Sequence, residues 1–439
     1  MGSRVPISDL IDSGALVIND GYRAKNSELS VQGVPFARAQ NIGSGGFHFD
    51  DAVFFPQQEL HRVGIKVSEP GDVVFTSKGT VGRFAFVRND TPRFVYSPQL
   101  CFWRSLDHAV IHPRWLYYWM CSREFYVQYS GVAGQTDMAE YVSLRDQRGM
   151  YITLPSTTEQ KAIACILGAL DDKIEVNRRT NQTANRIIQS LFKSWFVDFD
   201  PVRKKAESRQ AAGDLNPDLA SLFPDAFSES SLGPIPFGWT VQRISDITEI
   251  NKRTLSRNDT LDVIDYVEIS AVMKGEISEI ARYQRGEEPS RARRRLAHGD
   301  TVISTVRPDR GAYFLCLNPS PSLIASTGFA VISPKEGIWA FVHSALTQPE
   351  VGQELGRLAD GGAYPAIRPH VIGDLPLVMP RDQRIVRVFE RIVQPLYEKA
   401  YRNRAVSQTL AELRDTLLPR LISGELKIRD ADRIIGRAL

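Results

Sequence analysis

The segment ALDDKIEVNRRTNQT at residues 169–183 recurs as PLYEKAYRNRAVSQT at residues 395–409, an offset of 226 residues. Two other segments repeat in the same order at nearly the same offset. They are EPGDVVFTSKGTVGRFAFV (69–87) with AHGDTVISTVRPDRGAYFL (297–315), and SPQLCFW (97–103) with STGFAVI (326–332). Several repeats in one order at one spacing predict a duplicated architecture. The alternative is a chance likeness between two generic stretches of helix and strand.

Each repeat contains short apolar runs that flank a turn. Residues 72–77 and 83–87 flank KGTVG, and residues 300–305 and 312–317 flank VRPDRG. Apolar runs punctuated by glycine and proline are typical of paired β-strands. Helical stretches are also expected around residues 113–129 and 339–355. We therefore predict two mixed, β-rich domains, each followed by a long helix.

The long helices carry heptad patterns. Ser156 and Glu159 form a capping-box signal just before the first pattern. The first seam holds Ile163, Leu167, Leu170, Ile174, Asn177, Asn181, Ala184, Ile188, Leu191 and Trp195. The second holds Phe389, Val393, Leu396, Ala400, Asn403, Ser407, Leu410, Arg414, Leu417 and Leu421. Apolar residues at this spacing are typical of coiled-coil partners.

Both seams become polar at the same middle layers, with Asn177 and Asn181 in one helix and Asn403 and Ser407 in the other. Polar seam residues lower stability but fix register. They predict that the two helices pair antiparallel about a pseudo-dyad. The alternative is that each helix packs on its own domain and the asparagines face water. Pro395 predicts a kink or a fresh helix start, because proline disrupts a helix interior.

The fold class predicted is α+β, with two pseudo-repeated, mixed β-rich recognition domains separated by two long helices that pair as an antiparallel coiled coil. The second β-rich domain should begin near Trp239, after a linker rich in proline, serine and charge. The predicted division is 1–154 first domain, 155–197 first long helix, 198–236 linker, 237–380 second domain, 381–428 second long helix and 429–439 C-terminal tail.

The composition of the 439 residues is that of a globular protein, with 43% hydrophobic and 24% charged residues. Lys and Arg number 54 against 51 Asp and Glu, so nucleic-acid binding would have to come from local clustering. No apolar run approaches the ~18 residues of a membrane helix, and no signal peptide is recognisable. None of the four cysteines forms a CxxC pair. These features predict a cytoplasmic protein with free thiols and no membrane contact.

Common catalytic motifs are missing from the sequence. We find no P-loop, no dinucleotide-binding GxGxxG and no HExxH. His108 and His112 lie four residues apart, but Pro113 follows and no third ligand is near. We therefore predict neither catalytic nor metal-binding residues in this chain. An enzyme with an unrecognised site stays open as an alternative.

Local basic clustering does indicate a nucleic-acid partner. Residues 282–310 hold eight arginines against four acidic residues. Arg307 and Arg310 fall in a strand–strand loop whose counterpart in the first repeat carries other polar side chains. The DNA-contacting candidates from these regions are Lys78, Thr80, Arg83, Arg291, Arg293, Arg294, Arg307 and Arg310. Arginine binds phosphates and also presents a bidentate fork to guanine. The alternative for the run SRARRR is a solvated surface.

The motifs resemble a known family. LPSTTEQKAIACILGALDDKIEVNRRTNQ with LFKSWFVDFDPVRKK is similar to the first conserved helical region of type I restriction–modification specificity subunits, and LRDTLLPRLISGELKI to their C-terminal end. RARRRLAHGDTVISTVRPDRGAY and LADGGAYPAI resemble their target-recognition domains. The resemblance covers residues 33–428. The first domain ends without the Ala-Tyr-Pro form of the second.

This resemblance implies a non-catalytic subunit whose two domains each read one half of a bipartite, asymmetric DNA site. It implies double-stranded DNA, two modification subunits and restriction subunits as partners. It places no cofactor in this chain, and S-adenosylmethionine, ATP and Mg on the partners. At the domain ends it adds Gln135, Thr136, Tyr364 and Arg368 as DNA-contacting candidates. The competing hypothesis is a helical scaffold that does not read sequence.

Overall fold

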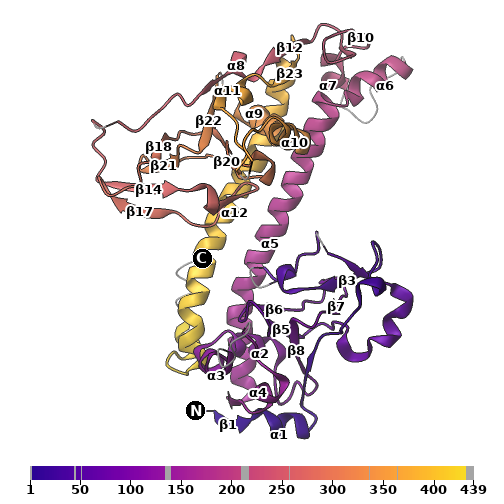
Figure 1. Cartoon of the computed structure of the whole chain (residues 1–439), viewed down its shortest axis with the longest axis vertical. Coiled ribbons are helices and arrows are strands. Elements are labelled where there is room, and N and C mark those ends of the chain that lie inside the picture. The colour runs from indigo at the N-terminus through magenta and orange to yellow at the C-terminus, as the bar shows by residue number, and fades with distance from the viewer. Residues whose placement is uncertain are drawn as a thin grey trace. The chain divides into compact units, whose positions relative to one another are not determined.

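The computed structural model describes residues 2–43, 46–50, 52–133, 140–208, 217–256, 258–335, 337–362 and 364–431. The chain forms two compact units (Figure 1). Unit 1 comprises residues 1–176 and 406–439, and unit 2 comprises residues 177–405. The division crosses both long helices, so each unit holds a β-rich domain and half of each helix.

Unit 1 is built on an antiparallel sheet with strand order β2-β8-β5-β6, beside a smaller sheet with order β4-β3-β7. Helices α2 and α3 occupy the stretch in which the sequence predicts helix. The domain's elements are β1 (Ser3–Pro6), α1 (Ile7–Asp12), β2 (Leu16–Asp20), β3 (Val34–Ala37), β4 (Phe54–Phe55), β5 (Val73–Thr76), β6 (Phe84–Phe86), β7 (Val95–Tyr96), β8 (Leu100–Ser105), α2 (Pro113–Met120), α3 (Arg123–Ala133), α4 (Leu144–Arg148) and β9 (Tyr151–Leu154). Short 3-10 helices η1 (Asn26–Glu28), η2 (Ala39–Asn41), η3 (Gln57–Arg62) and η4 (Gly64–Lys66) connect the strands.

Unit 2 has sheets with strand orders β13-β22-β19-β20 and β17-β14-β21-β18. Its domain comprises β12 (Thr240–Arg243), α8 (Ile244–Ile247), β13 (Thr248–Ile250), β14 (Val263–Val267), η5 (Ile269–Ala271), β15 (Val272–Met273), β16 (Glu276–Ile277), β17 (Ala281–Gln284), β18 (Ala292–Arg295), β19 (Thr301–Ser304), η6 (Pro308–Arg310), β20 (Tyr313–Leu315), β21 (Leu323–Ser326), β22 (Phe329–Pro334), α9 (Trp339–Leu346), α10 (Pro349–Arg357), α11 (Pro369–Gly373) and β23 (Pro376–Met379).

The four-stranded sheets β2-β8-β5-β6 of unit 1 and β13-β22-β19-β20 of unit 2 have the same topology. In each sheet the first strand along the chain pairs with the last, the last pairs with the second, and the second pairs with the third. In both units the second sheet contains a parallel pair, β3 with β7 in unit 1 and β14 with β21 in unit 2. The first and last strands of each domain pair antiparallel, β1 with β9 and β12 with β23. This agreement confirms the duplicated architecture that the repeats predict.

A buried aspartate marks the start of the equivalent strands β5 and β19. In unit 1 Asp72 accepts two hydrogen bonds from the guanidinium group of Arg104, at 2.6 and 2.8 Å. In unit 2 Asp300 is bound instead by Arg253, at 2.8 Å, and by the hydroxyl of Ser333. A buried carboxylate needs a paired charge to offset its desolvation. Both domains meet this need, with arginines from different parts of the chain.

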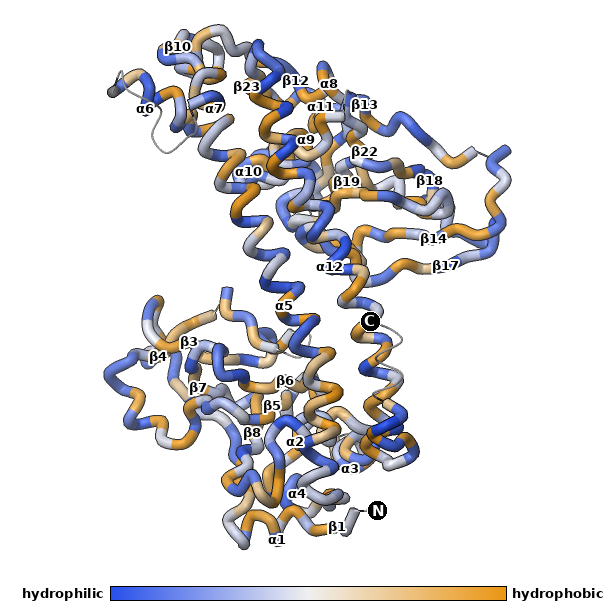
Figure 2. Tube along the Cα trace, turned by 180° about the vertical axis from the view of Figure 1, so that it is seen from behind, coloured by the Kyte–Doolittle hydropathy of each residue, from blue (hydrophilic) through white to orange (hydrophobic). Residues whose placement is uncertain are grey.

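The long helices are α5 (Thr157–Phe196) and α12 (Arg384–Ile422), and hydrophobic residues recur along both (Figure 2). The capping box is present, because the amide N–H of Ser156 donates to Glu159 and that of Glu159 donates to the Ser156 hydroxyl. In unit 1, seam leucines of both helices share one core, among them Leu167, Leu170, Leu410 and Leu417. In unit 2, Ile188 and Phe389 share another.

The asparagine layer joins the two helices within unit 2. Asn181 Nδ2 donates to the carbonyl of Ala400 at 3.2 Å, and Asn403 Nδ2 donates to Asn181 Oδ1 at 2.8 Å. Asn177 Nδ2 donates to the carbonyl of Asn403 at 3.4 Å. The exposed fractions of Asn177, Asn181 and Asn403 are 4, 9 and 7%, so these side chains do not face water. Ser407 is half-buried on α12. The helices therefore pack against each other antiparallel.

Pro395 does not end or restart α12, which is continuous from Arg384 to Ile422. The expected break is absent because Pro395 lies on the exposed face of the helix. Water there can satisfy the carbonyl group that the missing N–H of proline leaves unpaired.

The segment predicted as a linker contributes to the core of unit 2. It contains α6 (Asp200–Ser208), α7 (Pro217–Leu222) and a hairpin of β10 (Phe227–Ser228) and β11 (Ile235–Pro236). Phe199 and Phe223 are buried against Trp239 at the start of the second domain. Aromatic packing therefore holds this segment to the second domain.

Each long helix also docks onto a helix of the neighbouring domain by accepting backbone hydrogen bonds. In unit 1 Gln160 of α5 accepts from the amide of His112, just before α2, at 2.9 Å. In unit 2 Glu390 of α12 accepts from the amides of Phe341 and Ala340 in α9, at 2.7 and 3.3 Å. Burial raises the pKa of Glu390 to about 7, although these hydrogen bonds oppose the shift.

Replacing Glu390 with glutamine is expected to make unit 2 more stable at alkaline pH. A carboxyl group with a raised folded-state pKa stabilises the fold most below its unfolded pKa, about 4.5, and loses that contribution as pH rises through 7. Glu390→Gln should therefore gain about 3 kcal/mol at pH 8 and almost nothing at pH 4.5. Urea unfolding across this range measures the difference. The exposed Glu398→Gln on the same helix is the control, and parallel pH profiles for wild type and Glu390→Gln would refute the assignment.

Candidate nucleic-acid interface

The loop between β5 and β6 in unit 1 is fastened to the segment that closes the domain. The amide of Gly79 donates to the carbonyl of Glu140 at 3.0 Å, and the amide of Val142 donates to the carbonyl of Ser77 at 2.9 Å. Lys78, Thr80 and Arg83 are exposed on this loop. The loop backbone is therefore fixed while polar side chains project from it.

The loop between β19 and β20 in unit 2 is held by matching hydrogen bonds. The amide of Arg307 donates to the carbonyl of Pro365, and the amide of Ile367 to the carbonyl of Thr305, both at 2.8 Å. Each loop also forms an equivalent isolated β-bridge to the segment that closes its domain. Lys78 pairs with Tyr141 in unit 1, and Val306 pairs with Ala366 in unit 2. Arg307 therefore occupies the position of Gly79. The two loops share one backbone frame and carry different side chains.

Gly79 and Arg307 both have left-handed backbone conformations, with φ of 86° and 47°. Glycine adopts this region freely, whereas other L-residues lose roughly 1–2 kcal/mol there. An arginine at this position is unfavourable for the fold. Strained residues of this kind are concentrated at functional sites, where the side chain rather than the backbone is needed.

Each loop places a cation over an aromatic ring of the closing segment. The Nζ atom of Lys78 lies 6.0 Å from the ring centroid of Tyr141, and the Cζ atom of Arg307 lies 4.6 Å from that of Tyr364. Tyr364 is 73% exposed, a high value for an aromatic side chain. Stacking on a ring orients a guanidinium group while its N–H edge can still bind another partner. Arg310 and Arg368 are also exposed at this surface.

The arginine-rich strand β18 lies in the other sheet. Its start is linked to this loop through the turn at Thr327 and Gly328, because the amide of Thr327 donates to the carbonyl of Arg291 and the amide of Thr305 donates to the carbonyl of Gly328. Arg293 lies 3.6 Å from Glu288, and Arg294 has a buried Nε atom without a hydrogen-bond partner in the described part of the chain. Arg291 is exposed. Other arginines of the cluster form ion pairs within the domain, Arg282 with Asp265 at 2.8 Å and Arg295 with Asp259 at 2.6 Å. At least two of the eight arginines therefore have their charges paired within the domain.

Two candidate residues of the first domain, Gln135 and Thr136, lie outside the described residues, so the structure does not place them. Across the described ranges, no group of three or more His, Cys, Asp or Glu side chains is arranged to hold a metal ion. In the same ranges, no helix has the length and apolar character needed to cross a membrane.

The sequence reasoning missed Lys274, at the tip of the β15–β16 hairpin. Its amide donates to the carbonyl of Gly311 at 2.6 Å, and the amide of Gly275 donates to the carbonyl of Tyr313 at 2.7 Å. The hairpin tip therefore lies against the β19–β20 loop. The dipeptide Lys274-Gly275, which follows Val272 and Met273, is a weak hairpin signal that could have indicated the turn. Its position beside the loop depends on tertiary contacts.

The chain is similar to known proteins in sequence and in fold. Residues 7–186 match the family model described as the type I restriction modification DNA specificity domain. The type I restriction enzyme HindI specificity subunit of Haemophilus influenzae is 26% identical over 414 residues, covering 82% of this chain and 88% of that protein. The MjaIX specificity subunit of Methanocaldococcus jannaschii is 21% identical over 383 residues, covering 85% and 82%. The crystal structure of a type I restriction–modification S subunit from M. genitalium has a similar fold, with a TM-score of 0.54 at 13% identity and 96% coverage of both chains.

Proposed function

Because this chain belongs to the family of type I restriction–modification specificity subunits, we propose that each of its domains reads one half of a bipartite, asymmetric DNA sequence. The observation that carries this proposal is the pair of equivalent loops, residues 77–83 and 305–312. They share one hydrogen-bonded frame but differ in side chains. One scaffold with two sets of polar groups is suited to reading two different sequences.

The loops supply the two kinds of contact that sequence-specific recognition needs. Contacts to phosphates fix the position of a protein on DNA, and contacts to base edges specify the sequence. Arg307, oriented by Tyr364, is proposed to contact a base edge in the half-site of unit 2. Lys78, Thr80 and Arg83 are proposed to contact the half-site of unit 1. Arg310 and Arg368 are proposed to bind phosphates.

We further propose that the chain acts in the cytoplasm as the non-catalytic part of a larger complex. Two modification subunits would supply S-adenosylmethionine and transfer methyl groups, and restriction subunits would supply ATP- and Mg-dependent cleavage. Methylation of a base within a duplex requires that base to be flipped out of the stack. On this proposal flipping belongs to the modification subunits, while this chain positions them on the DNA. The duplicated units give two identical partners equivalent docking surfaces.

The test is methylation by the assembled complex. The chain, co-expressed with its modification subunits, should direct methylation to one bipartite sequence in a methylation-free host, as read by methylome sequencing. Modification subunits without this chain are the control and should leave that sequence unmethylated. If the complex binds no duplex and methylates no defined sequence, the proposed function is wrong. Methylation by the chain alone would instead make it an enzyme.

A further inference from the structure

The β19–β20 loop of unit 2 contains one turn of 3-10 helix, η6, and is fixed on both sides of it. On one side the amide of Arg307 donates to the carbonyl of Pro365, and on the other the amide of Lys274 donates to the carbonyl of Gly311. Arg307 and Gly311 both have left-handed backbones, with φ of 47° and 77°. The two ends are therefore held, and the position of η6 between them depends on what it packs against.

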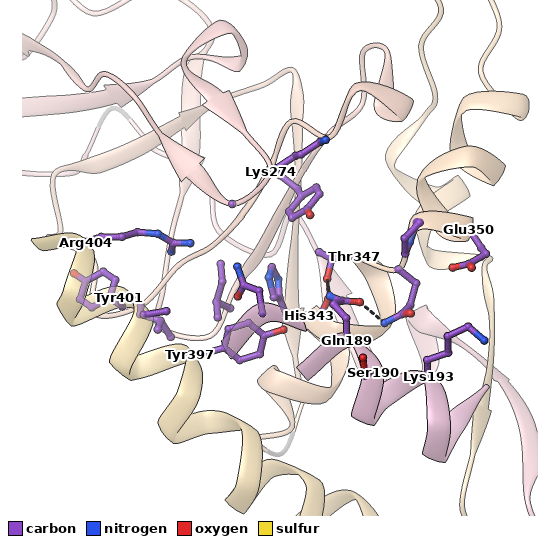
Figure 3. Close-up of a pocket in the computed structure, with 18 residues that line it drawn as sticks. Gln189, Ser190, Lys193, Lys274, His343, Thr347, Glu350, Tyr397, Tyr401 and Arg404 are labelled. Carbon is purple, nitrogen blue, oxygen red and sulfur yellow. Dashed lines mark hydrogen bonds between the residues drawn. The ribbon is translucent and has the colours of Figure 1, made fainter. Parts of the chain in front are cut away.

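Helix α10 is the element that lies against η6. It is held on the core of unit 2 by Leu355, which is 1% exposed. Its first turn borders an open space, because Glu350 lines a cavity of about 350 Å³ that Lys274 of the hairpin tip also lines (Figure 3). Its last turn meets the loop, where a Cβ atom built on Gly356 would lie 2.8 Å from Cβ of Asp309. The close contact between α10 and η6 is therefore made at a glycine.

Space is the reason for glycine at position 356. Gly356 lies within α10, in a backbone conformation that every L-residue can adopt. Glycine is disfavoured relative to alanine inside a helix, because it loses more conformational freedom on folding. Alanine would bring two carbon atoms to 2.8 Å, roughly 0.7 Å closer than ordinary contact at about 3.5 Å. The missing side chain thus lets η6 lie directly on α10.

Unit 1 has a contact of the same kind at the equivalent place. Helices α3 and α10 are each the second helix after the last strand of the four-stranded sheet. In unit 1 the glycine belongs to the loop, and a Cβ atom on Gly82 would lie 2.7 Å from the hydroxyl oxygen of Tyr129 in α3. Gly82 also has a φ of 96°, so its backbone favours glycine for a separate reason. Gly356 is therefore the position at which the contact can be tested alone.

We propose that Gly356 is a positioning residue for the recognition loop of unit 2, because it sets how closely η6 approaches α10 and so where Arg307 and Arg310 are presented. The proposal rests on the proposed function of this loop in reading DNA. A hydrogen bond is maintained over an N···O range of about 2.7–3.2 Å. A bidentate contact between an arginine and a base edge must satisfy two such ranges at once. Moving η6 by roughly 0.7 Å exceeds this tolerance.

The decisive variant is Gly356→Ala, measured in the assembled complex. It should weaken binding of the specific duplex about tenfold and lower base discrimination only in the half-site of unit 2. Discrimination in the half-site of unit 1 should not change, which separates displacement of one loop from a general loss of folded protein. Gly352→Ala, one turn earlier on α10, is the matched control, because a Cβ atom there would point into open space in the described part of the chain. This control should bind every duplex like the wild type.

A second substitution, at Asp309, distinguishes the size of the side chain from its charge. Asp309→Gly removes the Cβ atom that Gly356→Ala would meet, whereas Asp309→Ala keeps it and removes only the carboxylate. Combined with Gly356→Ala, Asp309→Gly should restore affinity to within about twofold of Asp309→Gly alone, and Asp309→Ala should restore none. If Gly356→Ala does not fold, recovery of folding by Asp309→Gly and not by Asp309→Ala supports the contact. Equal behaviour of the two combinations, or wild-type binding by Gly356→Ala, overturns the proposal.

Amide hydrogen exchange of the full chain tests the contact without DNA. Gly356→Ala should speed exchange of the Arg310 amide, which donates to the carbonyl of Arg307 at 3.0 Å, and Gly352→Ala should not. If the wild-type complex recognises no duplex, the proposed function is wrong, and faster exchange in Gly356→Ala would still establish Gly356 as the residue that positions η6. Unchanged exchange together with intact discrimination in both half-sites overturns the proposal while the proposed function stands.

Discussion

Replacing Arg307 with glycine is expected to abolish recognition of one half-site while leaving the chain about as stable as the wild type. Arg307 has a left-handed backbone, and its counterpart Gly79 shows that glycine fits this frame. The substitution relieves strain of roughly 1–2 kcal/mol. It also removes the stacking on Tyr364 and adds backbone freedom to the unfolded chain, each worth about 0.5–1 kcal/mol. These terms nearly cancel, so stability should stay within about 1 kcal/mol.

The effect on DNA should be much larger and confined to one half of the target. A bidentate arginine–base contact is worth about 1–3 kcal/mol of discrimination, which corresponds to about 5- to 160-fold in affinity. Competition assays with duplexes altered in one half or the other measure the loss. Arg384→Gly, an exposed arginine paired with Asp382 at the start of α12, is the control for charge removal. Equal affinity of Arg307→Gly and wild type for every duplex would contradict the proposed role. A uniform loss with a shallower salt slope would assign Arg307 to a phosphate instead.

Lengthening both long helices by one heptad is expected to change the spacer between the two half-sites. The boundary between the compact units crosses α5 after Val176 and α12 after Ala405. The variant carries two insertions: a copy of residues 177–183 before Asn177 and a copy of residues 399–405 after Ala405. Together they repeat the hydrogen-bonded asparagine layer. Seven residues extend a helix by about 10 Å, which corresponds to about three base pairs of DNA. If the helices set the spacer, the original target should lose methylation and one with a spacer longer by up to about three base pairs should gain it.

Two controls make the spacer experiment specific. Seven glycine and serine residues inserted after Leu232, in the exposed turn between β10 and β11, lengthen the chain outside the helices and should leave the spacer unchanged. A heptad inserted into α5 alone shifts Asn181 away from Asn403 and should lower stability, because buried amides lose their partners. A folded double insertion that still methylates the original target would rule out a role of the helices in setting the spacer.

The sequence by itself determined the duplicated architecture and the pairing of the long helices. Helix and strand periodicity are local properties, and a duplication leaves its offset in the sequence, so neither needs coordinates. The antiparallel register could be predicted because Asn177, Asn181 and Asn403 interrupt otherwise apolar seams. A polar residue in such a seam is stable only when it finds a polar partner in the facing helix. The loops that carry Lys78 and Arg307 were identified because they fall between repeated strands.

Only the tertiary structure decided which charged side chains are available for binding. Arg282 and Arg295 belong to the basic run of residues 282–310, and their charges pair with Asp265 and Asp259, which precede them in the chain. The left-handed backbone of Arg307 and the place of Lys274 beside Gly311 likewise depend on neighbours distant in sequence. Charge availability depends on distance and burial, because a cation paired within its own domain offers less to a ligand. In the sequence a paired arginine cannot be distinguished from one that can bind a ligand, because the partner of each side chain is decided only when the chain folds.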